Sequence, residues 1–248
     1  MTIDVSVVIP AYNEEKRLAG AIQEGVAYFQ RREERFEIIV VDDGSQDGTA
    51  RMARALTVIY PMVRLISLSP NCGKGAAVKA GVLSAHGRYV VFMDADLSIP
   101  IVELDKLLER LEGGLSDIAI GSRSVEGAEI AVPQKWTRRI TGRIFGLVTK
   151  CVALRGIADT QCGFKSMTRD AAQKIFPGVT SPTAIFDVEM LMIATREGFR
   201  ISEVPVKCSH DPETRIPLNI RYAVRMFLEL LRIRRAQKVR WPLKAKTV

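Results

Sequence analysis

Two aspartates, Asp94 and Asp96, follow an apolar run with only Ala95 between them. The run, Tyr89–Met93, is typical of a strand buried on both faces of a parallel sheet, where polar and apolar residues no longer alternate. Its carboxyl end is the edge at which open α/β sheets bind ligands. Carboxylates at this spacing, without His or Cys beside them, suit Mg²⁺ or Mn²⁺. The alternative is that one aspartate begins a turn and the other caps the following helix.

Polar side chains also follow other predicted strands at this edge. They are Asn13 and Glu14, Asp42 and Asp43, and Ser122 and Arg123. Asp42 can accept hydrogen bonds from a base or a ribose, or it can instead begin the Asp-Gly-Ser turn. Lys74 stands between two glycines, where its compact charge would meet a phosphate with help from loop amides. The convergence of these groups indicates a polar ligand at this edge.

Two later segments carry further reactive groups. Asp159–Lys165 reads Asp-Thr-Gln-Cys-Gly-Phe-Lys and forms either a surface turn or part of the site. Asp187 and Glu189 lie near a predicted helix start, where they either favour the helix dipole or face the site. No Walker loop is present, and no Gly-x-Gly-x-x-Gly follows the first strand. The latter absence argues against a nicotinamide dinucleotide.

The elements that must position these residues alternate between strand and helix. We expect strands at 5–10, 37–42, 63–68, 89–93, 117–120 and 200–206. We expect helices ending near 32, following Asp47, ending near 85, and at 101–112, 135–154, 169–176, 187–197 and 218–238. The alternation predicts an α/β fold with a mostly parallel central sheet flanked by helices, wound with right-handed crossovers. The pattern is regular as far as Arg123 and elaborated beyond it.

Composition bounds the class of protein. The chain has 248 residues, of which 47% are hydrophobic and 26% charged, as expected for a soluble globular protein. Its four cysteines, at 72, 151, 162 and 208, show neither zinc-finger nor redox spacing, so free thiols in a reducing compartment are expected. The N-terminus lacks a secretory pattern, and no apolar run reaches the ~20 residues that span a bilayer. We therefore expect a cytoplasmic protein, peripheral to the cytoplasmic face of a membrane.

The membrane expectation comes from the C-terminal residues. The residues from Ile216 onward include nine Lys or Arg and one acid, Glu229. This excess of positive charge equals the whole formal charge of +8. The last predicted helix combines an apolar face with a basic one, as in helices that lie on anionic membranes. Its apolar residues are Tyr222, Met226, Phe227, Leu230, Leu231 and Ile233, and its basic residues are Arg221, Arg225, Arg232 and Arg235. The alternatives are a core-packed helix with a solvated basic side, or nucleic-acid binding, which the low aromatic content of 6% and the absence of a motif disfavour.

The motifs described above resemble those of the family-2 glycosyltransferases of the GT-A fold, and among them the transferases that act on polyprenyl (dolichyl) phosphate. The matching segments are Val8–Glu14, Val41–Ser45, Asn71–Gly75, Asp94–Asp96, Gly121–Arg123 and Asp159–Lys165. The last segment, followed by Phe186-Asp187-Val188-Glu189, favours the glucosyl branch over the mannosyl branch. The resemblance implies a GT-A domain over 1–212, followed by a basic amphipathic helix and tail over 213–248.

The resemblance also implies roles for individual residues. Pro10, Ala11, Tyr12, Glu14 and Asp42 would cradle the base and ribose, with Lys74 near that pocket. Asp94, Ala95 and Asp96 would face the nucleotide sugar, and Asp96 is the surer metal ligand. Arg123 would approach a phosphate, and Asp159 and Lys165 would border the reacting centre. Thr214-Arg215 is the candidate to close over the diphosphate, although the Trp often found just before it is absent here.

The expected activity is inverting, metal-dependent transfer of a hexose to dolichyl or polyprenyl phosphate. UDP-glucose or GDP-mannose would supply the sugar, and Mg²⁺ or Mn²⁺ would neutralise the leaving diphosphate. A lipid phosphate is already ionised at neutral pH and needs no strong base, whereas a sugar hydroxyl would need one, for which Asp187 or Asp159 is the candidate. The alternatives are a non-lipid sugar acceptor and a non-catalytic protein that binds nucleotide sugars.

Overall fold

The computed structural model describes residues 3–132, 154–209, 220–237 and 243–247. Its strands are β1 (Val5–Ala11), β2 (Phe36–Asp42), β3 (Val63–Ser67), β4 (Tyr89–Met93), β5 (Ile118–Ser122), β6 (Glu129–Val132), β7 (Leu154–Arg155), β8 (Phe164–Thr168), β9 (Arg200–Pro205), β10 (Lys207–Ser209), β11 (Leu243–Lys244) and β12 (Lys246–Thr247). Its α-helices are α1 (Leu18–Arg32), α2 (Thr49–Ile59), α3 (Lys74–Leu83), α4 (Leu104–Glu112), α6 (Arg169–Ile175), α7 (Phe186–Arg196) and α8 (Ile220–Ala236). Short 3₁₀ helices cover Ile101–Glu103 and Phe176–Gly178.

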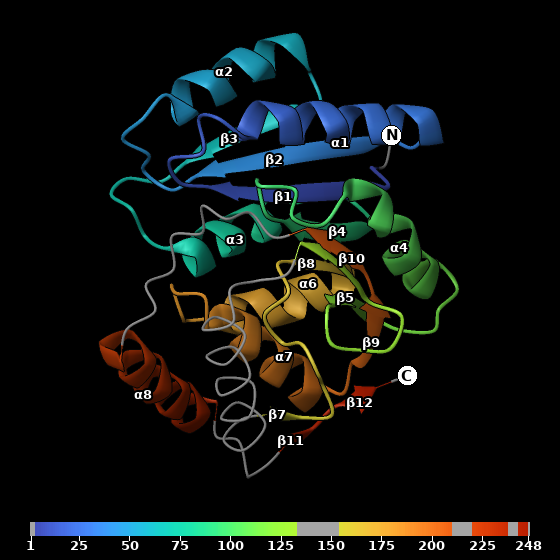
Figure 1. Cartoon of the computed structure of the whole chain (residues 1–248), viewed down its shortest axis with the longest axis vertical. Coiled ribbons are helices and arrows are strands. Elements are labelled where there is room, and N and C mark those ends of the chain that lie inside the picture. Colours follow the sequence, from blue (N-terminus) through green and yellow to red (C-terminus); the bar gives the residue numbers. More distant parts are fainter. Residues whose placement is uncertain (1–2, 133–153, 210–219, 238–242, 248) are drawn as a thin grey trace.

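The central sheet has eight strands in the order β12-β9-β5-β8-β4-β1-β2-β3. All neighbouring pairs are parallel except the two that involve β8, which runs antiparallel to both β4 and β5. The predicted α/β fold with a mostly parallel sheet is therefore confirmed. The carboxyl ends of β1, β2 and β4 meet at one edge, and β1 and β2 point to it at the left of Figure 1.

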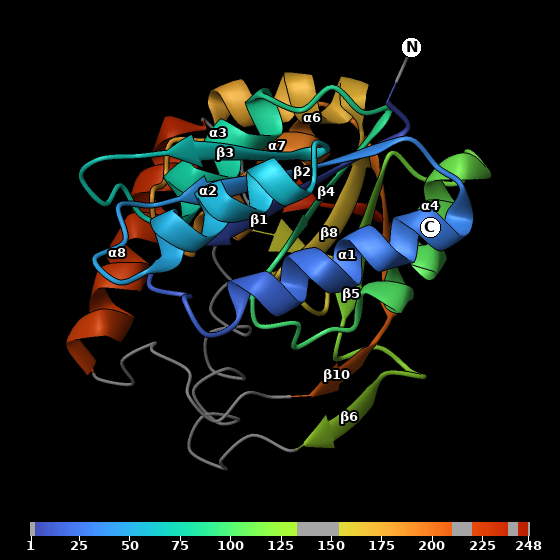
Figure 2. The same ribbon diagram turned by 90° about the horizontal axis from the view of Figure 1, so that it is seen from above.

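Helices cover both faces of this sheet, and each face has its own hydrophobic core. One core joins the sheet to α3, α6 and α7 and includes Met226, Leu230 and Ile233 of α8, so these three residues of the predicted membrane-facing side are buried within the protein. The other joins the opposite face to α1, α2 and α4. Figure 2 shows the two helical layers on either side of the strands. Along each central strand, successive side chains point alternately into one core and into the other. Both faces of these strands are therefore apolar, and their sequences are continuous apolar runs.

In the second half of the chain several strands lie where the sequence predicts none, and one of them, β8, lies in the middle of the central sheet. Asp159–Lys165 is predicted to form a surface turn or part of the site, yet its last two residues, Phe164 and Lys165, begin β8, which lies between β4 and β5. Lys165, the second residue of this strand, is completely buried. The predicted helix at 135–154 lies outside the described residues, apart from Leu154, which begins β7.

The tail returns to the body of the protein after α8. Residues 246 and 247 of β12 pair in parallel with Arg200 and Ile201 at the edge of the central sheet. The division of the chain at residue 212 stays a prediction. No helix among residues 3–132, 154–209, 220–237 and 243–247 combines the length and apolar character needed to cross a bilayer.

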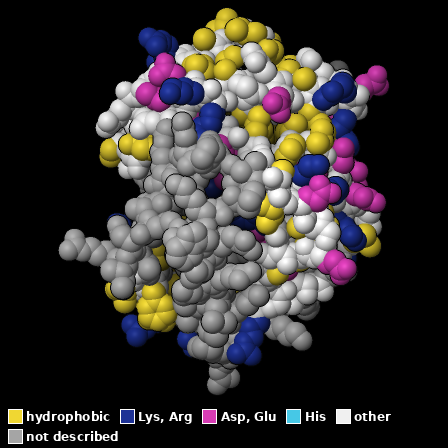
Figure 3. Space-filling model, viewed as in Figure 1, with side chains coloured by type: hydrophobic (Ala, Val, Ile, Leu, Met, Phe, Trp, Pro, Cys, Tyr) yellow, Lys and Arg dark blue, Asp and Glu magenta, His cyan; other side chains and the backbone are white. Residues whose placement is uncertain are grey.

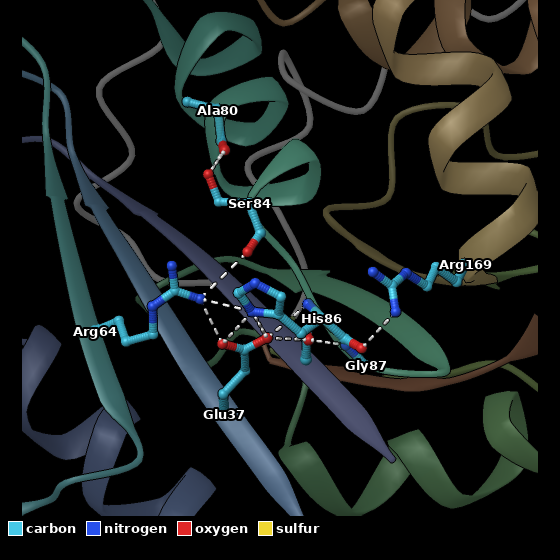
Figure 4. A network of polar contacts seen from close by, with 8 residues as sticks. Glu37, Arg64, Ala80, Ser84, His86, Gly87 and Arg169 are labelled. Carbon is cyan, nitrogen blue, oxygen red and sulfur yellow. Dashed lines mark hydrogen bonds and ion pairs between the residues drawn. The ribbon is translucent and has the colours of Figure 1, made fainter. Parts of the chain in front are cut away.

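A polar cluster lies at the opposite edge of the sheet, where β1 and β2 begin. Glu37, at the start of β2, accepts hydrogen bonds from the Ser6 hydroxyl (2.6 Å), the His86 amide (2.7 Å) and the Arg64 guanidinium (2.6 Å). Arg64 also bonds to the Ser84 carbonyl, and Arg169 bonds to the carbonyl of His86 (Figure 4). The cluster therefore ties β1, β2 and β3 to the turn that precedes β4.

Candidate functional site

The loops that follow β1 and β2 are bonded to each other. The Asn13 amide donates to Ser45 Oγ (2.9 Å), and the Gln46 amide donates to Asn13 Oδ1 (2.8 Å). Asn13 adopts a left-handed conformation with φ of 57°, which Asn tolerates better than most residues. The reciprocal bonds fix the two loops as one wall of the strand-end edge.

The residues expected to cradle a base and ribose lie on this wall. Ala11 and Asp42 are register partners at the ends of β1 and β2, and both are buried. Tyr12 follows Ala11 and is 40% exposed, so its ring is accessible from the strand-end edge. Glu14 forms an ion pair with Arg17 (2.7 Å). Pro10 precedes Ala11 in β1 and is partly buried, so the structure brings all five predicted residues to one place.

A second wall carries Lys74, the first residue of α3. Its ammonium group lies 2.6 Å from Oδ1 of Asp94, at the end of β4. Burial alone would lower the pKa of Lys74, but the carboxylates of Asp94, Asp187 and Asp96 outweigh it and raise the pKa. Lys74 is therefore a fixed positive charge, with about a third of its side chain open to solvent.

The loop before Lys74 is held by Asp43. The carboxylate of Asp43 accepts hydrogen bonds from the amides of Cys72 (2.7 Å) and Gly73 (2.8 Å), and its carbonyl accepts one from the Asn71 side chain. Asp43 is buried at the end of β2. Asp43 therefore joins the wall formed by the loops after β1 and β2 to the wall that carries Lys74.

Asp94 and Asp96 stand at the centre, where β4 ends. Asp96 Oδ1 accepts a hydrogen bond from the Ser98 amide (2.9 Å), and Asp94 faces Lys74. Gly163 lies directly against Asp94, since a Cβ at 163 would be 2.2 Å from Asp94 Oδ2. Only a residue without a side chain leaves that carboxylate in place.

A divalent ion fits this pair as a shared site. Both side chains are partly exposed and supply hard oxygen atoms, which Mg²⁺ and Mn²⁺ prefer. Among the residues that the structure describes, no group of three or more His, Cys, Asp or Glu is placed to hold a metal. Asp94 and Asp96 would therefore hold an ion together with water and phosphate oxygens, as Mg²⁺ is commonly bound.

A third wall is formed by Arg123 and Asp159. Nε and Nη2 of Arg123 donate to Oδ2 (2.7 Å) and Oδ1 (2.9 Å) of Asp159, and the Arg123 amide donates to Oδ2 as well. Burial would raise the pKa of Asp159, but these bonds outweigh it and hold the pKa below its usual range. Glu203 of β9 completes the wall, since its carboxylate accepts the amides of Ala158 (2.7 Å) and Asp159 (3.0 Å). The arrangement presents a guanidinium of fixed orientation near the strand ends.

Lys165 and Asp187 form the floor. Lys165 Nζ lies 2.5 Å from Asp187 Oδ1, bonds to the Cys162 carbonyl and lies 5.4 Å from the centre of the Phe92 ring. Burial raises the pKa of Asp187, and the charges of Lys165 and Lys74 only partly offset that rise. Both side chains are closed to solvent. In this structure they lie beneath the site rather than on its surface.

Two further predictions, the diphosphate-binding pair Thr214-Arg215 and the acid Glu189, are not found at this edge of the described structure. Arg215 and Thr214 lie outside the described residues. Glu189 is completely buried in α7, where it accepts the amides of Thr180 (2.8 Å) and Ser181 (2.7 Å). Its bonds hold the loop before α7, so it does more than favour the helix dipole.

Comparison with known proteins identifies the family. A model of glycosyl transferase family 2 matches residues 6–176. The chain is 37% identical to the dolichyl-phosphate beta-glucosyltransferase ALG5C of Trichomonas vaginalis, over 91% of this chain and 69% of that protein. It is also 37% identical to the human dolichyl-phosphate beta-glucosyltransferase, over 83% of this chain and 67% of the relative, and 33% identical to that of Saccharomyces cerevisiae, over 94% and 75%.

The chain belongs to glycosyl transferase family 2. Solved structures agree on the fold of this transferase. Glucosyl-3-phosphoglycerate synthase from Mycobacterium tuberculosis, in complex with UDP, superposes with a TM-score of 0.67 over 96% of this chain and 81% of that one, at 18% identity. Another crystal structure of that enzyme, holding Mn²⁺, UDP-glucose and phosphoglyceric acid, gives 0.67 at 17% identity. The predicted GT-A fold is confirmed.

The sequence does not reveal how three residues shape the site of this transferase. Asp43 stands among the polar residues at the predicted strand ends, Gly163 belongs to a matching segment, and Glu203 carries no signal of its own. Asp43 and Glu203 each bind two consecutive backbone amides of a loop far away in the chain. An acid at or near a strand end is the only local signal for such a role, and it does not identify the loop.

Proposed function

We propose that this transferase moves glucose from UDP-glucose to dolichyl or polyprenyl phosphate, with inversion at the anomeric carbon. The observation that carries the proposal is the similarity to dolichyl-phosphate beta-glucosyltransferases over nearly the whole chain. The family match at 6–176 includes the positions of Lys74, Asp94, Asp96, Arg123 and Asp159. Those residues meet at one edge of the sheet.

The walls of the site suggest how a nucleotide sugar would lie. Tyr12 and Asp42 would receive the base and ribose, and Lys74 would receive the diphosphate. Arg123, oriented by Asp159, would face a second phosphate, which in this proposal belongs to the acceptor. A divalent ion held by Asp94 and Asp96 would neutralise charge on the leaving diphosphate. That a structural neighbour was crystallised with Mn²⁺ and UDP-glucose is consistent with such a site.

The reaction is a single displacement. A phosphate oxygen of the acceptor forms a bond to the anomeric carbon, while the bond from that carbon to the β-phosphate oxygen breaks and UDP leaves with the electron pair. The acceptor phosphate is already an anion, so no side chain has to remove a proton. The buried position of Asp187, bonded to Lys165, agrees with a mechanism that needs no exposed base. Attack from the opposite face converts an α-linked sugar into a β-linked product.

The proposed acceptor is a membrane lipid, and α8 offers a surface for the membrane. Val224, Phe227 and Leu228 are exposed on it together with Arg225 and Arg232. Figure 3 shows hydrophobic and basic side chains together at the lower left, where α8 lies in Figure 1. Apolar side chains beside arginines suit the interface of an anionic bilayer. The attraction of each basic residue to such a surface contributes about 1 kcal/mol to binding. We infer peripheral attachment at the cytoplasmic face through this surface.

Product analysis tests the proposal. Purified transferase is incubated with Mn²⁺, a short polyprenyl phosphate and either UDP-glucose or GDP-mannose, and the lipids are examined by mass spectrometry. We expect a hexosyl-phospholipid from UDP-glucose, loss of the product with a chelator, and near-complete loss in Asp96→Ala. Asp170→Ala, which removes an exposed acid of α6, serves as the control and should retain activity. Product from GDP-mannose alone would overturn the assignment of the donor. In a parallel reaction with a free sugar in place of the lipid, a glycosylated sugar in the absence of any glycolipid would overturn the assignment of the acceptor.

A further inference from the structure

Glu229 is the one acid in the basic C-terminal stretch, and it does not serve the surface of α8. Its carboxylate points toward the loop that precedes α7. Oε1 of Glu229 accepts hydrogen bonds from the hydroxyls of Ser181 (2.5 Å) and Thr183 (3.0 Å). Glu229 therefore grips this loop on either side of Pro182.

Pro182 lies between the two gripped residues and contacts the lysine loop through its backbone. Its carbonyl accepts a hydrogen bond from the Gly75 amide at 2.8 Å. A Cβ at Gly73 would be 2.3 Å from the same carbonyl oxygen, and a Cβ at Gly75 would be 2.3 Å from the Ser181 carbonyl oxygen. The two glycines that flank Lys74 thus rest directly on 181–182. A shift of this loop must move the backbone of Lys74, because no side chain lies between to absorb it.

The loop has a second anchor in the core. Glu189 accepts the amides of Thr180 and Ser181, and its Oε1 also accepts the side-chain amide of Gln237 (3.0 Å), just beyond α8. Glu189 belongs to α7 and is completely buried, so it ties the loop to the body of the protein. Glu229 ties the same loop to α8 instead.

We propose that Glu229 is a positioning residue for Lys74. Through Glu229, the packing of α8 against the loop before α7 would influence the binding of the nucleotide diphosphate. The contacts run from Glu229 through 181–183 to the glycines around Lys74, and from Lys74 to Asp94. This inference rests on the proposed function for the ligand of Lys74. It adds that α8, which is distant from the loops after β1 and β2, helps to set the affinity for the nucleotide.

Calorimetric titration with UDP in the presence of Mn²⁺ tests the inference without any acceptor. Glu229→Ala removes both bonds, and we expect UDP affinity to fall about tenfold, equivalent to ~1.4 kcal/mol. Glu229→Gln keeps an oxygen that can accept both hydroxyls and should restore most of the affinity. Glu197→Ala removes an exposed acid at the end of α7 and should leave the affinity unchanged.

A double-mutant cycle separates positioning from a general loss of stability. In a Lys74→Met background, Glu229→Ala should have no further effect on UDP affinity, because the residue through which it acts is gone. Equal losses in both backgrounds, or a lower melting temperature with unchanged UDP affinity, would overturn the inference and leave Glu229 as an anchor of α8 alone. Failure of the glucosyl-transfer assay with intact UDP binding would instead count against the proposed acceptor.

Discussion

The ammonium group of Lys74 lies 2.6 Å from Oδ1 of Asp94, one of the two carboxylates expected to hold a divalent ion. A cation at Asp94 must therefore compete with a cation that the protein itself supplies. Lys74 has an alternative partner once a diphosphate arrives, since phosphate oxygens attract the same charge. We therefore expect ordered binding, in which a divalent ion binds firmly only together with the nucleotide.

Replacing Lys74 tests this competition. We expect Lys74→Met to bind Mn²⁺ about tenfold more tightly in the absence of nucleotide, and UDP about tenfold more weakly, each change corresponding to ~1.4 kcal/mol. Free Mn²⁺ measured by electron paramagnetic resonance gives the first value, and calorimetry gives the second. Lys174→Met removes a lysine paired with Asp170 on the surface and should change neither. Weaker Mn²⁺ binding in Lys74→Met would show that the two cations do not compete.

Gly163 should be intolerant of the smallest side chain. In Gly163→Ala the new methyl group would lie 2.2 Å from Asp94 Oδ2, so the carboxylate must move. We expect the turnover number to fall by about two orders of magnitude, with the fold retained by circular dichroism. Gly20→Ala provides the control, because no atom lies within 4 Å of a Cβ there and alanine favours the helix. Full activity of Gly163→Ala would mean that the placement of Asp94 is unimportant.

The pair of Arg123 and Asp159 should matter for chemistry as well as stability. Asp159→Asn removes the buried carboxylate that pairs with the partly exposed guanidinium of Arg123, at a cost of about 2 kcal/mol in the free energy of unfolding. It also frees the guanidinium to reorient, so the turnover number should fall at least tenfold. The matched control is Asp117→Asn, because Asp117 makes a similar two-point pair with Arg200 at the opposite edge of the sheet. Equal losses of turnover in the two variants would indicate a structural role only.

Glu37 should make folding sensitive to acid without affecting the site. Burial would raise its pKa, but the bonds from Ser6, His86 and Arg64 outweigh burial and hold the pKa below the ordinary 4.5 (Figure 4). The stability that ionised Glu37 contributes is thus present above that value and lost as the pH falls through its lower pKa in the folded state.

Urea unfolding at several pH values measures this contribution. We expect Glu37→Gln to lower the free energy of unfolding by about 2 kcal/mol at neutral pH, with a smaller difference from the native protein as the pH falls below 4.5. Glu109→Gln, at an exposed position of α4, should have little effect at any pH. A difference that grows on acidification would contradict the direction of the pKa shift.

The strands were predictable where local sequence suffices. The runs that became β1, β2 and β4 are apolar because each is buried between two helical layers, and the acids at their ends mark the site edge. The strand β8 was not predictable in this way, because its Lys165 is buried only by virtue of Asp187, which lies 22 positions further along the chain. The local sequence does not indicate that a charged side chain is buried when its ion-pair partner lies in another element.

The same limit applies to the support of the site. Asp42, Asp94 and Arg123 were identifiable because strand ends converge in a parallel sheet. The role of Glu229 depends on a loop 46–48 residues earlier in the chain, and in the sequence it appeared only as an exception to a basic stretch. Side chains that hold a loop by its amides or hydroxyls are visible only when the loop itself has been placed.

The short strand β12 has a consequence for anyone who shortens this protein. By pairing with Arg200 and Ile201 it covers the start of β9, the next strand in from the rim of the central sheet. Removing residues beyond α8 would leave that rim open as a template for strands from other molecules. A shortened chain would then be prone to self-association, and a loss of activity on truncation would need a check for aggregation before it is credited to weaker membrane attachment.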